Sequence, residues 1–303
     1  MTADEVPGSG IIIIDKPRGP SSHQVTAWAG KILGLPVGHA GTLDPGVSGV
    51  LVVMLGGAAR LAPYLQRGGK EYVCLWRLHG DVPVERIREV TKEFEGRIYQ
   101  RPPKKAAVKR ALRIRTVSRL EILEAEGRLV LFRVTCDAGT YIRSLCHHMG
   151  LAAGAGGSMR ELRRTRSGSF AEADAHTLQE LEDAAHAARE GNPGPLRAMI
   201  LPAERAVADL PRVTIRDTAV DALCHGASLA GVGLVKVEGA FGAGEPLGIF
   251  TQKGEIVAIG EALAGSEKIV PGSTGLVAAP RAVFMSPGTY PKGWRKRKEK
   301  PGK

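Results

Sequence analysis

The sequence predicts an α+β protein in which a large domain of mixed strands and helices precedes a small β-barrel. Up to about residue 205, segments with helical spacing alternate irregularly with apolar, strand-like runs, which argues against a regular series of βαβ units. Beyond about residue 210, short strand-like runs alternate with glycine-rich turns, which is typical of a small barrel of roughly eighty residues. The composition shifts between these parts, at the Gly- and Pro-rich stretch 191–195.

In the larger part, strands are expected where short apolar runs occur, and helices where apolar residues recur three or four positions apart. We expect strands at 11–15, 50–55, 71–78 and 129–136, with one or two more within 111–123. We expect helices from the capping residues Ser21 or Ser22 to about Gly34, and at 84–94, 140–153 and 178–189. The segment 38–49 is rich in Gly, Pro, Asp and Thr and is predicted to be a loop.

In the smaller part, turn residues separate five strand-like runs. We expect strands at 212–215, 233–237, 246–251, 255–260 and 275–278, and one helix at 218–223. The last dozen residues are rich in Lys and Arg and lack apolar periodicity, so we expect a flexible tail.

Composition excludes several classes of protein. No stretch approaches 18 uninterrupted apolar residues, which excludes a transmembrane helix. The first residues are acidic where a secretory signal would be basic, so we expect a cytoplasmic protein without a membrane partner. The cysteines are far apart and form no C-x-x-C pair, so we expect neither structural zinc nor disulfides but four small core side chains. They are Cys74, Cys136, Cys146 and Cys224.

The net charge of +11 is concentrated in two segments. Residues 97–119 contain nine Lys or Arg and no acid, and residues 292–303 carry a net charge of +6. The rest of the chain is therefore mildly acidic. Two concentrated basic segments indicate a polyanionic partner. Taken singly, each segment is also consistent with a solvated face or a flexible tail.

The segment 39–49, with sequence HAGTLDPGVSG, is the most informative stretch. Asp44 stands in a glycine-flanked loop before a buried strand, Pro45 fixes the backbone after it, and the glycines allow another chain to approach closely. A carboxylate held in this way is a candidate nucleophile or base. Asp-Pro pairs in loops commonly only form turns, so the residues alone leave both interpretations open.

This loop resembles the catalytic motif of the bacterial tRNA-type pseudouridine synthases and their archaeal and eukaryotic guide-RNA relatives. Further stretches resemble that family in matching order: DKP at 15–17, KEY at 70–72, GTYIR at 139–143 and ELRR at 161–164. Others resemble the guide-RNA branch, the dyskerin-like catalytic subunit of H/ACA ribonucleoproteins: YQRPP at 99–103, LRIR at 112–115, IRDTAVD at 215–221 and HG at 225–226. The resemblance spans about residues 10–291, and five ordered motifs make chance agreement negligible.

The resemblance implies an enzyme that isomerises uridine to pseudouridine in RNA. Asp44 would be the catalytic carboxylate, and Arg143 would be a buried partner that keeps it ionised. Tyr72 would stack on the base and help to move the C5 proton. Lys16 would support the catalytic loop. The reaction breaks the C1′–N1 bond and joins C1′ to C5 without redox change or hydrolysis, so we expect no cofactor and no metal.

The substrate pocket is also assigned by resemblance. Tyr141 and Leu162 would line it, and His39 would contact the extruded nucleotide or fill the space that it leaves. A uridine inside folded RNA must be flipped out, which costs a few kcal/mol offset by contacts in the pocket.

The resemblance also implies a domain plan and partners. A catalytic domain is expected at 10–205, a PUA RNA-binding domain at 209–286, and a basic tail at 287–303. The expected partners are an H/ACA guide RNA, substrate rRNA or tRNA, and three proteins: a small zinc-ribbon protein, a small β-barrel protein and a kink-turn RNA binder. The lack of long lysine-rich extensions favours an archaeal form.

Two departures and two alternatives accompany this interpretation. Gly46 stands where guide-RNA relatives often carry a basic residue, and Gly157-Ser158 stands where Ala-His is usual, so local RNA contacts are expected to differ. A stand-alone tRNA pseudouridine synthase would share the same active site. A non-catalytic RNA-binding scaffold would share the charge pattern, but it would be free to lose Asp44, Tyr72 and Arg143.

Overall fold

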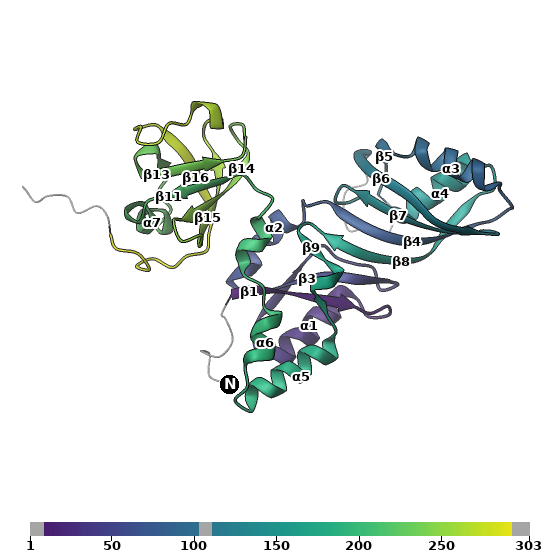
Figure 1. Ribbon diagram of the computed structural model, residues 1–303, viewed down its shortest axis with the longest axis horizontal. Coiled ribbons are helices and arrows are strands. Elements are labelled where there is room, and N and C mark those ends of the chain that lie inside the picture. Colours follow the sequence, from purple (N-terminus) through teal and green to yellow (C-terminus); the bar gives the residue numbers. More distant parts are fainter. Residues whose placement is uncertain (1–8, 103–110, 293–303) are drawn as a thin grey trace, which may run out of the picture. The chain divides into compact units, whose positions relative to one another are not determined.

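The computed structural model describes residues 9–102 and 111–292 (Figure 1). Part of the basic segment 97–119 and most of the predicted tail lie outside these residues. The chain divides into two compact units between Pro202 and Ala203, and each unit is described by itself.

The larger unit is built on one ten-stranded mixed sheet. Its strands are β1 Ser9–Lys16, β2 Val37–Ala40, β3 Val47–Gly56, β4 Lys70–Leu78, β5 Gly96–Gln100, β6 Arg113–Glu126, β7 Leu129–Cys136, β8 Gly157–Ser167, β9 Phe170–Ala171 and β10 Ala175–His176. The strand order is β10-β1-β3-β8-β4-β7-β6-β5, with β2 paired to β3 and β9 paired to β8. β1 with β10 and β3 with β8 are parallel, and the other pairs are antiparallel. The mixed α+β class is thus confirmed.

Helices pack beside this sheet. They are α1 Ser22–Leu33, α2 Ala62–Leu65, α3 Val84–Glu93, α4 Ile142–Ala152, α5 Leu178–Arg189 and α6 Gly194–Met199. α1 begins at a capping box: the Ser21 side chain accepts from the Gln24 backbone, and the Gln24 side chain accepts in return from the Ser21 backbone. It ends at Gly34, whose φ of 67° suits a residue without a side chain. The helices predicted from the spacing of apolar residues are therefore present.

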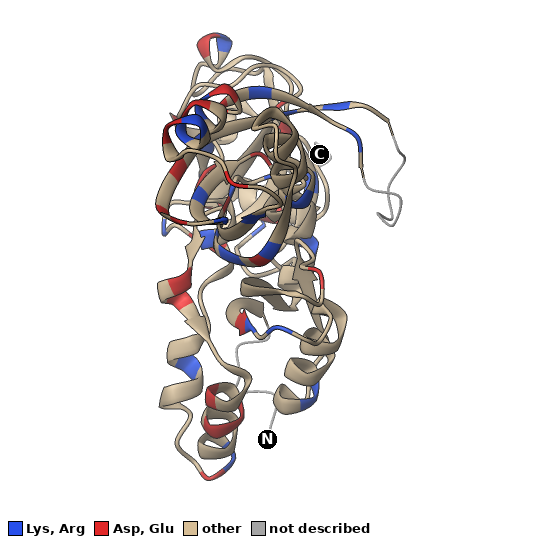
Figure 2. Cartoon of the chain, turned by 90° about the vertical axis from the view of Figure 1, so that its right-hand side faces the viewer, with Lys and Arg blue, Asp and Glu red and all other residues tan. Residues whose placement is uncertain are grey.

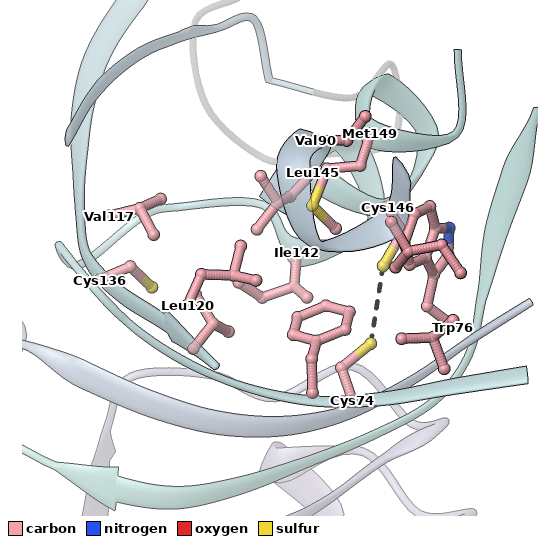
Figure 3. Close-up of a cluster of buried hydrophobic side chains, with 14 of the residues drawn as sticks. Cys74, Trp76, Val90, Val117, Leu120, Cys136, Ile142, Leu145, Cys146 and Met149 are labelled. Atoms are coloured by element: carbon pink, nitrogen blue, oxygen red, sulfur yellow. Dashed lines mark hydrogen bonds between the residues drawn. The ribbon is translucent and has the colours of Figure 1, made fainter. Parts of the chain in front are cut away.

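One apolar core joins α3 and α4 to strands β4, β6 and β7 (Figure 3). Cys74 and Cys146 meet in it with their sulfur atoms 3.6 Å apart, and Trp76 packs edge-on against Phe132. Three cysteines are buried as expected, whereas Cys224 is partly exposed, and all four are free thiols. A second core packs α1 and α5 against β1 and β3.

The smaller unit holds a six-stranded sheet. Its strands are β11 Arg212–Ile215, β12 Leu229–Ala230, β13 Leu234–Glu238, β14 Pro246–Thr251, β15 Ile256–Ala262 and β16 Leu276–Val283, in the order β12-β16-β15-β14-β11-β13, and its α-helix is α7 Asp217–Cys224. Tyr290, within the segment predicted as the tail, is buried, and its hydroxyl donates to Glu255 at 2.5 Å. The Gly288 amide donates to the Asp221 carboxylate. These contacts attach the end of the described chain to helix α7 and to the turn between β14 and β15.

One local prediction was wrong, and several strands were not predicted. The segment 38–49 is not all loop: β2 runs to Ala40 and β3 starts at Val47, because residues 37–40 pair in register with the buried strand. β8 was not predicted, and neither were β5, β9, β10 and β12. β8 carries four arginines and little apolar alternation, yet it lies in the sheet between β3 and β4.

Candidate active site

A six-residue turn between β2 and β3 carries Asp44. Lys16 is fully buried and fixes this turn by donating to the carbonyl oxygens of Val47 at 2.7 Å and Pro45 at 3.4 Å. The Ser22 hydroxyl donates to the Leu43 carbonyl at 2.9 Å. Burial lowers the pKa of Lys16, and the nearby Arg164 charge lowers it further. The predicted supporting role of Lys16 matches these contacts.

The exposed end of the turn presents the Asp44 carboxylate. Arg143 Nη2, near the start of α4, donates to Asp44 Oδ2 at 2.5 Å. The side chains of Arg143 and Asp44 are 56% and 61% exposed, so the predicted burial of this partner was wrong. Their contact nevertheless joins the turn to the helix and leaves Asp44 Oδ1 without a hydrogen bond to any described residue.

Arg164 of β8 is the buried arginine of this site, and no role was predicted for it. Its side chain is 1% exposed, and its Nε donates to the Val50 carbonyl at 2.8 Å. Its Nη2 donates to the Gly41 carbonyl at 2.7 Å, so one guanidinium joins the first residue of the Asp44 turn to strand β3, which follows the turn. Burial lowers the pKa of Arg164. The ELRR motif contained this residue, but no local pattern indicated that its side chain points inward.

Gly49 lets β8 approach the turn. Its φ is 100°, and a Cβ on it would lie 2.2 Å from the Arg164 carbonyl oxygen. Gly49 pairs with Arg164 in the parallel β3–β8 register. Only a residue without a side chain fits here, because any Cβ would collide with the backbone of β8.

Tyr72 of β4 lies opposite Arg164 across the antiparallel β4–β8 pair. Burial raises the pKa of the Tyr72 hydroxyl, and the Arg164 charge partly opposes this rise. Lys70, two residues earlier, is 5% exposed and donates to the carbonyl oxygens of Leu65 and Gly68. Burial, with a smaller contribution from the Arg164 charge, lowers the pKa of Lys70 to about 8.

The site contains one pocket of about 500 Å³. Five residues predicted for the site line it together: Asp44, Tyr72, Tyr141, Arg143 and Leu162. Its other lining residues are Gly41, Thr42, Leu43, Val47, Gln66, Lys70, Ala138, Gly139, Thr140, Ile142, Met159 and Arg164. The volume lies within the range of ordinary small-ligand sites, so the pocket has room for a single flipped nucleotide.

His39 stands apart from this group. It lies on β2 beside the pocket wall, its Nε2 is 3.4 Å from the Thr42 hydroxyl, and its ring contacts His23 edge-on at 4.8 Å. Thr42 itself lines the pocket. Burial lowers the pKa of His39, with further lowering by the charges of His23 and Arg164. In this conformation His39 therefore contacts the pocket wall through the Thr42 side chain.

Family models match most of the chain. One described as TruB family pseudouridylate synthase (N terminal domain) matches residues 34–142, and one described as tRNA pseudouridylate synthase B C-terminal domain matches 143–208. A PUA domain model matches 211–284. The probable tRNA pseudouridine synthase B of Methanosarcina barkeri is 51% identical over 290 residues, which cover 95% of this chain and 86% of the relative. The chain belongs to the TruB family of pseudouridylate synthases.

Other relatives of this TruB-family chain are similar at the same level. The probable tRNA pseudouridine synthase B of Archaeoglobus fulgidus is 50% identical over 94% of this chain and 89% of the relative. Among solved structures, a Cbf5-Nop10-Gar1 complex contains a chain with a TM-score of 0.90 and 51% identity, covering 93% of this chain and 87% of that one. An H/ACA RNP bound to a substrate RNA containing 2′-deoxyuridine gives a TM-score of 0.89 and 49% identity, covering 94% and 88%.

Family membership identifies this pocket as the candidate active site of an isomerase. Among the described residues no three His, Cys, Asp or Glu side chains gather as a metal site would require. None of the described helices is long and apolar enough to cross a membrane. The pocket presents a carboxylate with an arginine bound to it, two tyrosines and two buried cations. These residues are Asp44, Arg143, Tyr72, Tyr141, Lys70 and Arg164.

Proposed function

We propose that this chain is the catalytic subunit of an RNA-guided pseudouridine synthase, with Asp44 as the catalytic carboxylate. The observation that carries the proposal is the 2.5 Å contact between Arg143 and Asp44 at the wall of a pocket also lined by Tyr72. About half of the chain's residues are identical to those of Cbf5 chains that were solved with Nop10, with Gar1 or in an H/ACA RNP.

The proposed roles follow from charge and position. The Asp44 carboxylate is the reacting group, and the Arg143 guanidinium pairs with it and holds it in place. Asp44 Oδ1 then faces the sugar and base of the flipped uridine. Tyr72 stacks on the uracil and helps to move the C5 proton, while Tyr141 and Leu162 line the base pocket. His39 contacts the nucleotide or fills the space that it vacates.

We further propose the assembly in which this happens. A guide RNA selects the target uridine by base pairing, and the PUA domain binds that guide. Partner proteins equivalent to the Nop10 and Gar1 of the solved complexes complete the particle, together with a kink-turn RNA binder. The cytoplasm is the expected location, since the similar proteins named above come from archaea.

The test is pseudouridine formation in a defined rRNA fragment, read by carbodiimide modification and primer extension. The full chain and its partner proteins are incubated with and without a cognate guide, beside an Asp44→Ala control. Product that needs both the guide and Asp44 supports the proposal. No product in any lane, from a complex that still binds RNA, contradicts it.

A second candidate is guide-independent modification of tRNA. The names of the curated relatives favour it, since they are described as probable tRNA pseudouridine synthases. Both candidates use the same pocket, so only the substrate distinguishes them. Conversion of a bare tRNA transcript without guide, abolished by Asp44→Ala, would establish this activity.

A non-catalytic RNA scaffold is the remaining alternative. It predicts that changes at Asp44 leave pseudouridine levels unchanged while RNA binding continues. Asp44→Asn is the informative variant, because it keeps the shape of the side chain and removes its charge. Full modification by Asp44→Asn would contradict the proposed role of the carboxylate.

A further inference from the structure

The rim of the pocket carries an arginine that the proposed reaction does not use. Arg115 of β6 packs its guanidinium against Gly139, one of the residues that line the pocket. A Cβ built on Gly139 would lie 3.4 Å from both Nε and Nη2 of Arg115. Gly139 has a φ of 78°, so the absence of a side chain here permits both the turn and the close approach of the arginine.

The hydrogen-bonding capacity of Arg115 is mostly unused. Its Nη1 donates to the Ile114 carbonyl at 2.8 Å, and its Nε is buried, so the donors open to an external anion are the N–H groups of Nη2 and the second N–H of Nη1. None of the described acids lies within ion-pair distance of it. Arg119, four residues further along β6, instead pairs with Glu121 at 3.1 Å. A guanidinium that is held in place but lacks an acid partner is suited to an external anion.

The other cations of the pocket are already occupied. Arg143 binds Asp44, and Arg164 and Lys70 donate to backbone carbonyl oxygens. When a base enters the pocket, its flanking phosphates remain at the rim, because the backbone rotates the nucleotide outward from the strand. Figure 2 shows further Lys and Arg positions on the chain segments that flank the grey loop, so this side of the larger unit attracts polyanions.

We propose that Arg115 binds a backbone phosphate adjacent to the flipped nucleotide of the substrate RNA. This inference rests on the proposed function for its ligand. It adds a phosphate contact to the site, which positions the strand so that the target sugar lies at Asp44. Arg is preferred over Lys at such a position because its planar guanidinium can donate two hydrogen bonds to one phosphate, here from the terminal Nη1 and Nη2.

The test is a double-mutant cycle on substrate affinity, in which a substitution in the protein is combined with a change in the RNA. It is measured in the Asp44→Ala complex, which binds substrate without turnover. Arg115→Met removes the charge and keeps packing against Gly139, and Arg119→Met is the matched control on the same strand. Each is measured with substrate RNA that has a methylphosphonate on the 5′ or the 3′ side of the target. We expect Arg115→Met to weaken binding about tenfold. We also expect that, in the Arg115→Met complex, the methylphosphonate on one of the two sides causes no further loss of affinity.

Salt dependence provides a second readout. Loss of one phosphate contact should reduce the slope of log K against log salt by about 0.7 to 1. An equal loss in Arg119→Met, or a methylphosphonate effect that persists in Arg115→Met, would overturn the proposal. The cycle measures binding, so it gives a result whether or not pseudouridine forms, and turnover of the wild-type complex tests the proposed function separately. Thermal unfolding of each variant confirms that it is folded.

Discussion

Arg143 and Asp44 are 99 positions apart in the sequence, and a 2.5 Å hydrogen bond joins their side chains. Both are more than half exposed, so the bond adds little to the stability of the folded chain. Its consequence is chemical, because it fixes one oxygen of a carboxylate that lines the pocket. The relationship predicts that stability and activity respond very differently to changes at position 143.

Arg143→Met should therefore leave the free energy of unfolding within about 1 kcal/mol of the wild type. Pseudouridine formation should fall by about a hundredfold or more, since a charged group placed at the reacting carboxylate is lost. Urea unfolding and single-turnover assays measure the two effects. A matched loss of stability and activity would show that the pair is structural instead.

Arg164→Lys should disturb the Asp44 turn while keeping the buried charge. An ammonium group cannot donate to the Gly41 and Val50 carbonyl oxygens with the same geometry, so one acceptor loses its partner at a cost of about 1–3 kcal/mol. We expect activity to fall at least tenfold as the turn loosens. The control is Arg163→Lys, because Arg163 binds Asp15 instead. An equal effect of the two variants on activity would argue against a specific hold on the turn.

Gly49→Ala should destabilise the protein by several kcal/mol, because the new Cβ would lie 2.2 Å from a backbone oxygen at a φ of 100°. Gly46→Ala in the turn just before β3 is the control, since nothing lies within 4 Å of a Cβ at that position. Thermal unfolding compares the two variants. Equal melting temperatures would contradict the close approach of β3 and β8.

Lys70 should make the free energy of unfolding depend on pH in the alkaline range. Its pKa is lowered to about 8 in the folded protein, so between pH 8 and its unfolded value the unfolded chain binds more protons. The contribution of Lys70 to the free energy of unfolding therefore rises with pH across that window, by up to about 3 kcal/mol. Below the window this contribution is constant. The difference in unfolding free energy between wild type and Lys70→Met, measured from pH 7 to 10, isolates this effect from other groups. A difference that does not change with pH would contradict the lowered pKa.

Tyr72→Phe separates stacking from hydroxyl chemistry. The ring that would stack on the base remains, while the hydroxyl opposite Arg164 is removed. We expect substrate affinity within about threefold of the wild type and a slower chemical step, whereas Tyr72→Ala should lose about 1–3 kcal/mol of stacking as well. Single-turnover rates and substrate affinity distinguish the two steps. Equal rates for wild type and Tyr72→Phe would exclude a role for the hydroxyl in proton movement.

The order of most elements and the identity of the turn that carries Asp44 could be predicted from the sequence. Apolar periodicity predicted α3, α4 and α5, because a helix that buries one face must repeat apolar residues along it. Ordered motifs predicted the family and named five residues that share one pocket. These features are local, or they lie in short segments that can be compared directly with those of other proteins.

The burial of charged residues, in contrast, depends on tertiary packing. β8 has a polar sequence, yet its place between β3 and β4 turns Arg164 inward, where backbone carbonyl oxygens satisfy it. The same packing leaves Arg143 exposed and places Arg115 on the pocket rim beside Gly139. A charged side chain is buried or exposed according to the partners that distant segments bring to it, and no local pattern encodes those partners.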